Sequence, residues 1–192
     1  MNLEAALKPY KTTFGKLEAH QHEDLVAFLT RILDEPIEPY LMGYILSTVG
    51  NESYHLFRPQ EWKDRKLGKF YGRGIIPLRG EEAYRRASEL TGVNLVRTPK
   101  RVLEPEFAYD LAVRGMMEGV YTGVRLVDFA GATGKKLWPA RAVIEPEWRQ
   151  YLDRYIVELV DRTWIKVIYK AKGISTVGLQ AVGRRQGRVL TK

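Results

Sequence analysis

Hydrophobic positions in the N-terminal part of the chain recur at the three- and four-residue spacing of a helix. One apolar stripe ends at the Asp-Glu-Pro motif of 34–36 and predicts a helix. It lies within a mostly helical segment, 1–40, that we expect to break near Gly15. A second stripe predicts a helix over 42–51 with one buried face. The stripes consist of Leu25, Phe28, Leu29, Ile32 and Leu33, and of Leu41, Ile45, Thr48 and Val49.

Helical spacing continues through most of the remaining chain, and strand patterning is confined to 72–78. Pro105 and Gly119 bound one group of apolar positions, as expected of a helix with proline in its first turn and glycine at its end. Pro146 opens a long amphipathic pattern. Helices are expected over 81–90, 105–119, 125–129, 138–144 and 146–168.

The predicted fold class is therefore mainly α (α+β), with a small β segment beside a helical core. A chain of 192 residues that is 45% hydrophobic can bury the core of one domain, which we expect over 1–169. Residues 170–192 hold six basic residues, four glycines and no acidic residue, which predicts a flexible or weakly structured basic tail. This tail is expected to be either an ordinary solvated terminus or an anchor for a polyanion. No stretch of apolar residues is long enough to predict a membrane span, and 1–16 does not have the apolar centre of a conventional secretory signal.

Glu52 places a carboxylate at the end of the second apolar stripe. It follows Ile45 by seven residues and Leu41 by eleven, and both intervals return to the same face of a helix. Burial without a cationic partner raises the pKa of a carboxyl group, which suits a general acid. The alternative is that Glu52 lies just past the helix end and points to water.

A series of motifs begins at Glu52. The segments are Asn51-Glu52-Ser53, Phe57-Arg58-Pro59, Glu61 and Tyr71-Gly72-Arg73-Gly74. This order resembles glycoside hydrolase family 19, the plant-type chitinases, and more closely the phage endolysins of that family, which cleave peptidoglycan. The resemblance covers about residues 40–160 and continues through 103–106, 114–119 and 121–123.

The resemblance implies a lysozyme-like fold and hydrolysis of a glycosidic bond with inversion. Glu52 would protonate the leaving oxygen, and Glu61 would activate the attacking water. The resemblance also implies a peptidoglycan or chitin-like substrate, a monomer and no cofactor. It implies synthesis in a host cytoplasm and action at the cell wall or in the periplasm, or carriage in a virion. The residues expected to bind substrate are Tyr71, Arg73, Arg79, Arg141 and Glu145.

Four positions differ from the family pattern. Asn51 replaces a histidine, Pro77 a glutamine, Arg79 a small hydroxyl residue and Glu145 an asparagine. We expect Arg79 to lie near Glu61, where a cation would lower the pKa of the carboxyl group and weaken it as a base. Three functions therefore stay open: an active wall hydrolase, a related module that binds glycan without cleaving it, and a basic nucleic-acid binder, for which no recognised motif is present.

Composition narrows the possible partners. The net charge of +8 favours polyanions, including nucleic acid, anionic lipid and the phosphorylated polymers of a cell envelope. A basic segment, 62–69, is expected to be a solvated loop or the rim of a binding groove. The absence of cysteine excludes disulfides and thiolate metal sites. His20 and His22 are expected at the surface, so no metal site is predicted, and Pro77 breaks the glycine pattern of a dinucleotide loop.

Overall fold

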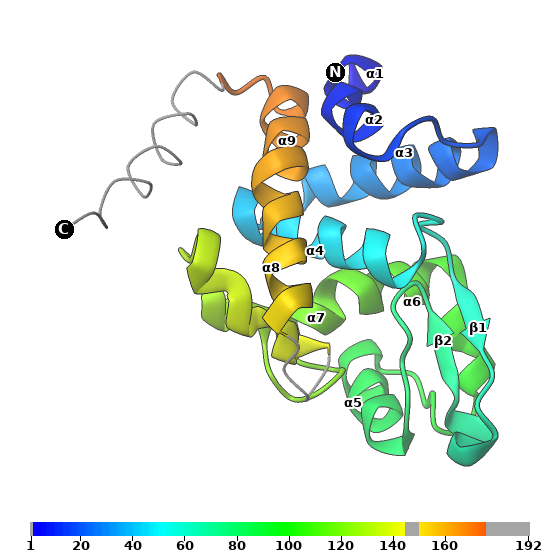
Figure 1. Ribbon diagram of the computed structural model, residues 1–192. Helices are drawn as coiled ribbons and strands as arrows, with labels where there is room; N and C mark the ends of the chain where they lie inside the picture. Colours follow the sequence, from blue (N-terminus) through cyan, green and yellow to red (C-terminus); the bar gives the residue numbers. More distant parts are fainter. Residues whose placement is uncertain (1, 145–149, 176–192) are drawn as a thin grey trace.

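The computed structural model describes residues 2–144 and 150–175, which form a mainly helical protein with one two-stranded sheet (Figure 1). The predicted fold class is confirmed, whereas the lysozyme-like arrangement stays a prediction. None of the described helices is both long and apolar enough to cross a membrane. The elements are α1 (Leu3–Ala6), α2 (Lys8–Phe14), α3 (Ala19–Asp34), α4 (Pro39–Glu52), β1 (Gln60–Trp62), β2 (Gly72–Gly74), α5 (Glu81–Thr91), α6 (Pro105–Asp110), α7 (Met116–Glu118), α8 (Gln150–Leu159) and α9 (Ile165–Ala171).

The N-terminal helices follow the apolar pattern. The expected break near Gly15 is confirmed, because α2 ends at Phe14 and Gly15 takes a φ of 81°. The five positions of the first stripe are all buried on α3. This helix ends at Asp34, within the Asp-Glu-Pro motif, as predicted. His20 is exposed and His22 half-buried, so both lie at or near the surface as expected.

Helix α4 is the central element of the molecule. It packs against α3, α8 and α9, and every residue from 41 to 50 is buried. The prediction of one buried face is therefore wrong, because neighbouring helices cover this helix on all sides. Gly43 permits close packing, since a Cβ there would lie 3.1 Å from Cγ1 of Val160. The helix begins before the predicted residue 42 because Pro39 suits a first turn, and it ends at Glu52.

The described residues form two hydrophobic cores. The larger core surrounds α4 and contains both predicted stripes, apart from Thr48, which is buried but polar. The smaller core joins α5 to the sheet region through Tyr84, Phe70 and Leu78. Glu52 therefore belongs to a helix of the larger core, whereas Glu61 belongs to a strand beside the smaller one.

The sheet is a short antiparallel hairpin, and its first strand was not predicted. In its register Glu61 lies opposite Arg73, and Trp62 lies opposite Gly72. The expected strand 72–78 is interrupted, because the chain turns after Gly74 and Leu78 returns to pair with Arg73. Gly74 has a φ of 114°, and a Cβ there would lie 2.9 Å from the Ile76 carbonyl oxygen, so the turn requires glycine.

Several segments expected as α-helix or loop have other helical geometry. The pattern over 105–119 contains a π-helical turn at Leu111–Gly115, and another at Val160–Trp164 joins α8 to α9 (Figure 1). Residues 126–129 and 134–143 form 3₁₀-helix. Pro139 accounts for the 3₁₀ geometry of 134–143, because proline has no backbone N–H to donate to an α-helical hydrogen bond. The basic segment 62–69 is largely a 3₁₀-helix, Arg65–Phe70.

Candidate active site

Glu52 forms a largely buried ion pair with Arg141. Nη2 of Arg141 lies 2.6 Å from Oε1 of Glu52, and the two side chains are 2% and 17% exposed, respectively. Nδ2 of Asn51 also donates to Oε1 at 3.4 Å. The predicted substrate-binding residue Arg141 thus contacts the predicted acid, and the premise that Glu52 has no cationic partner is wrong. The ion pair requires Glu52 as a carboxylate, whereas a general acid donates a proton.

Glu61 is held by two side chains from the segment around β2. The Tyr71 hydroxyl donates to Oε1 of Glu61 at 2.8 Å, and Nε of Arg73 lies 3.3 Å from the same oxygen. The Tyr71 hydrogen bond is the main cause that lowers the pKa of Glu61, and the Arg73 hydrogen bond and charge add to it. Glu61 is therefore ionised near neutral pH, which is the form that a general base needs.

Arg73 is fixed by a network of its own. Its side chain is 3% exposed, and Nη1 donates to the Lys69 carbonyl oxygen and to the Tyr84 hydroxyl, each at 2.9 Å. The guanidinium also lies over the Tyr71 ring, 3.5 Å from its centre. Because these contacts occupy the Arg73 guanidinium, Arg73 holds Glu61 and Tyr71 in position. The sequence predicted a different role for Arg73, binding of sugar.

Arg79 does not occupy the place expected for it. The Arg79 side chain is exposed, and its Nε lies beside Gly72. A Cβ atom added to Gly72 would lie only 3.1 Å from that nitrogen. Within the described ranges no ion pair joins Arg79 to Glu61; the arginine that pairs with Glu61 is Arg73. The local sequence could not distinguish the two, because Arg73 faces Glu61 only through the register of a strand that was not predicted.

A hydrogen bond links the two segments that carry Glu52 and Glu61. Nε2 of Gln60, the residue before Glu61, donates to the carbonyl oxygen of Ser53, the residue after Glu52, at 3.1 Å. The buried Ser53 hydroxyl in turn accepts the backbone N–H of Phe57 at 3.1 Å. A side-chain hydrogen bond therefore joins the end of α4 to the start of β1, the two segments that carry Glu52 and Glu61.

The turn between the carboxylates has an unusual backbone. Tyr54, His55 and Phe57 have φ values of 53°, 61° and 52°, a region that residues other than glycine rarely adopt. Such strain persists only where surrounding contacts impose it, and it gathers at functional sites. Sequence reasoning missed this turn because none of the three residues is glycine or asparagine, the usual signals of positive φ.

His55 connects the turn to helix α2 through a hydrogen bond and ring packing. Its Nδ1 lies 2.7 Å from the Tyr10 hydroxyl, and its ring packs on Phe14 with 4.4 Å between ring centres. Burial lowers the pKa of His55, so the imidazole is neutral near pH 7. Tyr54, the preceding residue, is 73% exposed, so its aromatic ring lies largely in solvent.

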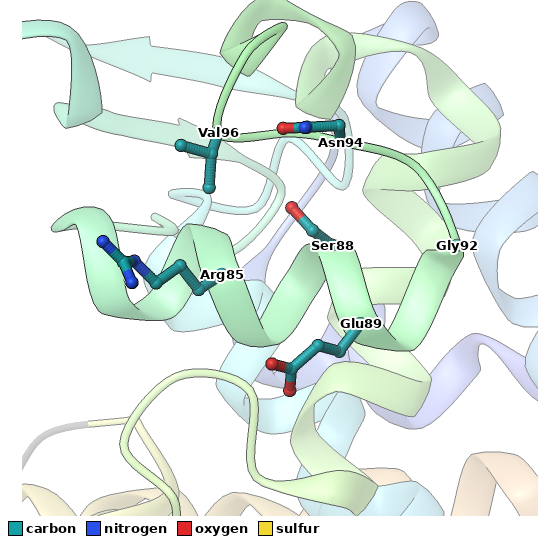
Figure 2. A pocket seen from close by; sticks show the side chains of 6 residues that line it. All are labelled: Arg85, Ser88, Glu89, Gly92, Asn94 and Val96. Carbon is teal, nitrogen blue, oxygen red and sulfur yellow. The ribbon is translucent and has the colours of Figure 1, made fainter.

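Other candidate chemistry lies elsewhere or outside the described residues. Glu145, predicted to bind substrate, falls outside them. No group of three or more metal-ligating side chains is present in the described part of the chain, and His22 instead lies 2.6 Å from a carboxylate oxygen of Glu4. A pocket of about 610 Å³ lies against α5 and the loop after it (Figure 2), and no predicted site residue lines it. Its Ser88 hydroxyl is already bonded to two backbone groups.

Comparisons of the chain with protein-family models, with curated proteins and with solved structures found no match. The central features of the candidate site are two carboxylates on adjoining segments, each with an arginine partner, and an exposed tyrosine between them in sequence.

Proposed function

We propose that the protein is an inverting glycoside hydrolase that cleaves the glycan strands of bacterial peptidoglycan or a chitin-like polymer. The observation that carries the proposal is the hydrogen bond from Gln60 to Ser53, which joins the segments that bear Glu52 and Glu61. An inverting site needs two carboxyl groups on opposite sides of the scissile bond, with space for a water molecule between them.

Glu61 is the proposed base. Its lowered pKa keeps it ionised, and the hydrogen bond from Tyr71 and the ion pair with Arg73 fix its orientation toward the attacking water. The same interactions weaken it as a base, because a carboxylate with a lower pKa has less affinity for the proton that it removes. A slow enzyme is the expected result.

Glu52 is the proposed acid, and Arg141 must be displaced from it before it can act. In the free protein the 2.6 Å contact occupies Oε1. Substrate binding next to Glu52 would separate the pair and exclude water, after which the carboxyl group can carry the proton that goes to the leaving oxygen. Glu52 takes up this proton from solvent as Arg141 is displaced, before water is excluded and the bond breaks.

Tyr54 is the proposed contact for a sugar ring. An aromatic face packs well on the apolar C–H face of a sugar, and its hydroxyl remains free to meet water or sugar hydroxyls. Its exposure of 73% and its position two residues after Glu52 suit such a contact.

The Glu52–Arg141 ion pair also favours the alternative, a module that binds glycan without cleaving it. If ligand binding leaves that pair intact, no proton donor is available and the site only binds. The two functions share the same surface and differ in turnover.

The test is release of reducing ends from purified peptidoglycan and from chitin. Glu61→Gln should lower the rate by about 10²–10⁴-fold. Glu89→Gln, an exposed carboxylate on α5, is the matched control and should retain the wild-type rate. The anomer first formed should be inverted.

Equal rates for Glu61→Gln and the wild type would show that Glu61 is not the base, and a retained anomer would exclude the inverting mechanism. If the wild type pulls down with either polymer but releases no ends, the binding module is the better description.

A further inference from the structure

A second surface, away from the carboxylates, has the character of a binding site. A groove of about 480 Å³ runs between α2 and the helix formed by the second π-helical turn and α9. These helices lie side by side in the upper part of the view (Figure 1). We call this surface the α2–α9 groove. It is lined by Lys8, Pro9, Thr12, Thr13, Arg162, Lys166 and Lys170.

Four of these seven residues are cations, and none is an acid. Lys8, Arg162, Lys166 and Lys170 are exposed, and none forms an ion pair with any residue that the structure describes. Lys11 on the same helix differs, because Glu4 neutralises it at 2.7 Å. The groove thus concentrates uncompensated positive charge.

Three of the cations form a row along one helix face. Arg162, Lys166 and Lys170 follow one another at intervals of four residues, which places them on the same side of the helix. Like charges at this spacing destabilise a helix. The row therefore does not stabilise the fold, and an anionic ligand would supply the missing counter-charge.

The walls of the groove are fixed. The hydroxyls of Thr13 and Thr163 lie 2.9 Å apart, and the rings of Tyr10 and Trp164 pack with 5.1 Å between centres, so α2 is held against its partner helix. Thr12 donates its hydroxyl hydrogen to the Lys8 carbonyl oxygen. The cations, and not the hydroxyl of Thr12, are thus the donors available to a ligand.

We infer that the α2–α9 groove binds a flexible polymer of phosphate groups that carries neither nucleic-acid bases nor acyl chains. Phosphates at regular intervals match a row of cations, and a flexible chain can follow the groove. Among the residues that the structure describes, no aromatic residue lines it for stacking with nucleic-acid bases, and no large apolar residue lines it for insertion into a membrane. In the sequence five more basic residues follow Lys170. The inference does not depend on the proposed hydrolase.

The test compares two double variants of the full chain that lose the same charge. Arg162→Gln with Lys166→Gln removes half of the cations in the groove. Arg97→Gln with Lys100→Gln removes two exposed cations near the 3₁₀-helix Pro99–Leu103, neither of them in an ion pair with a described residue. Affinity for poly(glycerol phosphate) and for inorganic polyphosphate is measured against salt, and thermal unfolding of each variant confirms that it is folded.

The groove variant should bind both polymers about 25-fold more weakly at 0.1 M salt, with a salt slope smaller by about 1.4, if each cation neutralises one phosphate as on a flexible single strand. The polymer affinity and salt slope of the control variant should change far less. Equal affinity of the two variants would overturn the proposal. So would tighter binding of the wild type to an oligonucleotide with the same number of phosphates, or to vesicles of anionic phospholipid, since either would assign the groove to another class of partner.

Discussion

The ion pair between Glu52 and Arg141 makes a strong prediction about stability. Arg141→Met removes the cation and leaves the Glu52 carboxylate in a site where its side chain is only 17% exposed. Breaking a buried pair in this way costs about 3–5 kcal/mol, because the remaining charge loses its compensation. For a chain of this size that corresponds to a fall in Tm of about 6–20 °C.

Glu52→Gln should carry a cost of the same kind, because Arg141 is 2% exposed and would remain charged. The double variant removes both members of the Glu52–Arg141 pair, so it should be less destabilised than the sum of the two single variants by about 2 kcal/mol or more. Urea unfolding followed by tryptophan fluorescence measures all three, since Trp164 is buried in the larger core.

A surface pair gives the control. Arg85 and Glu81 are 61% and 49% exposed, so Arg85→Met and Glu81→Gln should each change the stability little and show little coupling. If the Glu52 and Arg141 variants behave like this control, the buried ion pair does not exist in solution. The result also sets the conditions for any assay of Glu52→Gln, which must be run well below its Tm.

Three further predictions concern the site. Tyr71→Phe removes the main cause of the lowered pKa of Glu61, so the acidic limb of the pH profile of kcat/KM should move to higher pH; an unmoved limb would count against Glu61 as the base. Because burial lowers the pKa of His55, the unfolded state binds more protons below about pH 6.5, and the free energy of unfolding should fall on acidification through that value. Urea titrations at a series of pH values measure this loss, and His55→Gln should remove it. Tyr54→Ala should weaken glycan binding in a pull-down without lowering Tm, whereas Tyr155→Ala, at another exposed tyrosine, should change neither; equal binding by the two variants would exclude the sugar contact.

The helices were predictable because their information is local. The stripe from Leu25 to Leu33 repeats at the helical period, and burial of all five of its positions follows from that repeat. Glu52 was placed on α4 for the same reason. Strand β1 has only three residues, Gln60–Trp62, which is too short for an alternating pattern to be recognised.

The partners of the carboxylates were not predictable by the same means. Arg141 follows Glu52 by 89 residues, so no local pattern reports that the two meet. Arg73 reaches Glu61 through a strand register, and the anchoring of His55 by Tyr10 joins residues 45 positions apart. Sequence motifs identified the carboxylates as candidates, whereas their electrostatic surroundings depend on tertiary packing.

The π-helical turn at Val160–Trp164 has a consequence for how the long C-terminal helix tolerates changes in length. A π turn holds one residue more than the α-helical turn that it replaces. Deleting one residue there would restore α geometry and leave the faces of α8 and α9 in register, because the π turn holds its extra residue within a single turn. A deletion inside α9, where no π turn absorbs it, would rotate the residues after it by about 100° and carry Ile168 out of the larger core. A single-residue deletion within 160–164 should therefore be less damaging than one inside α9.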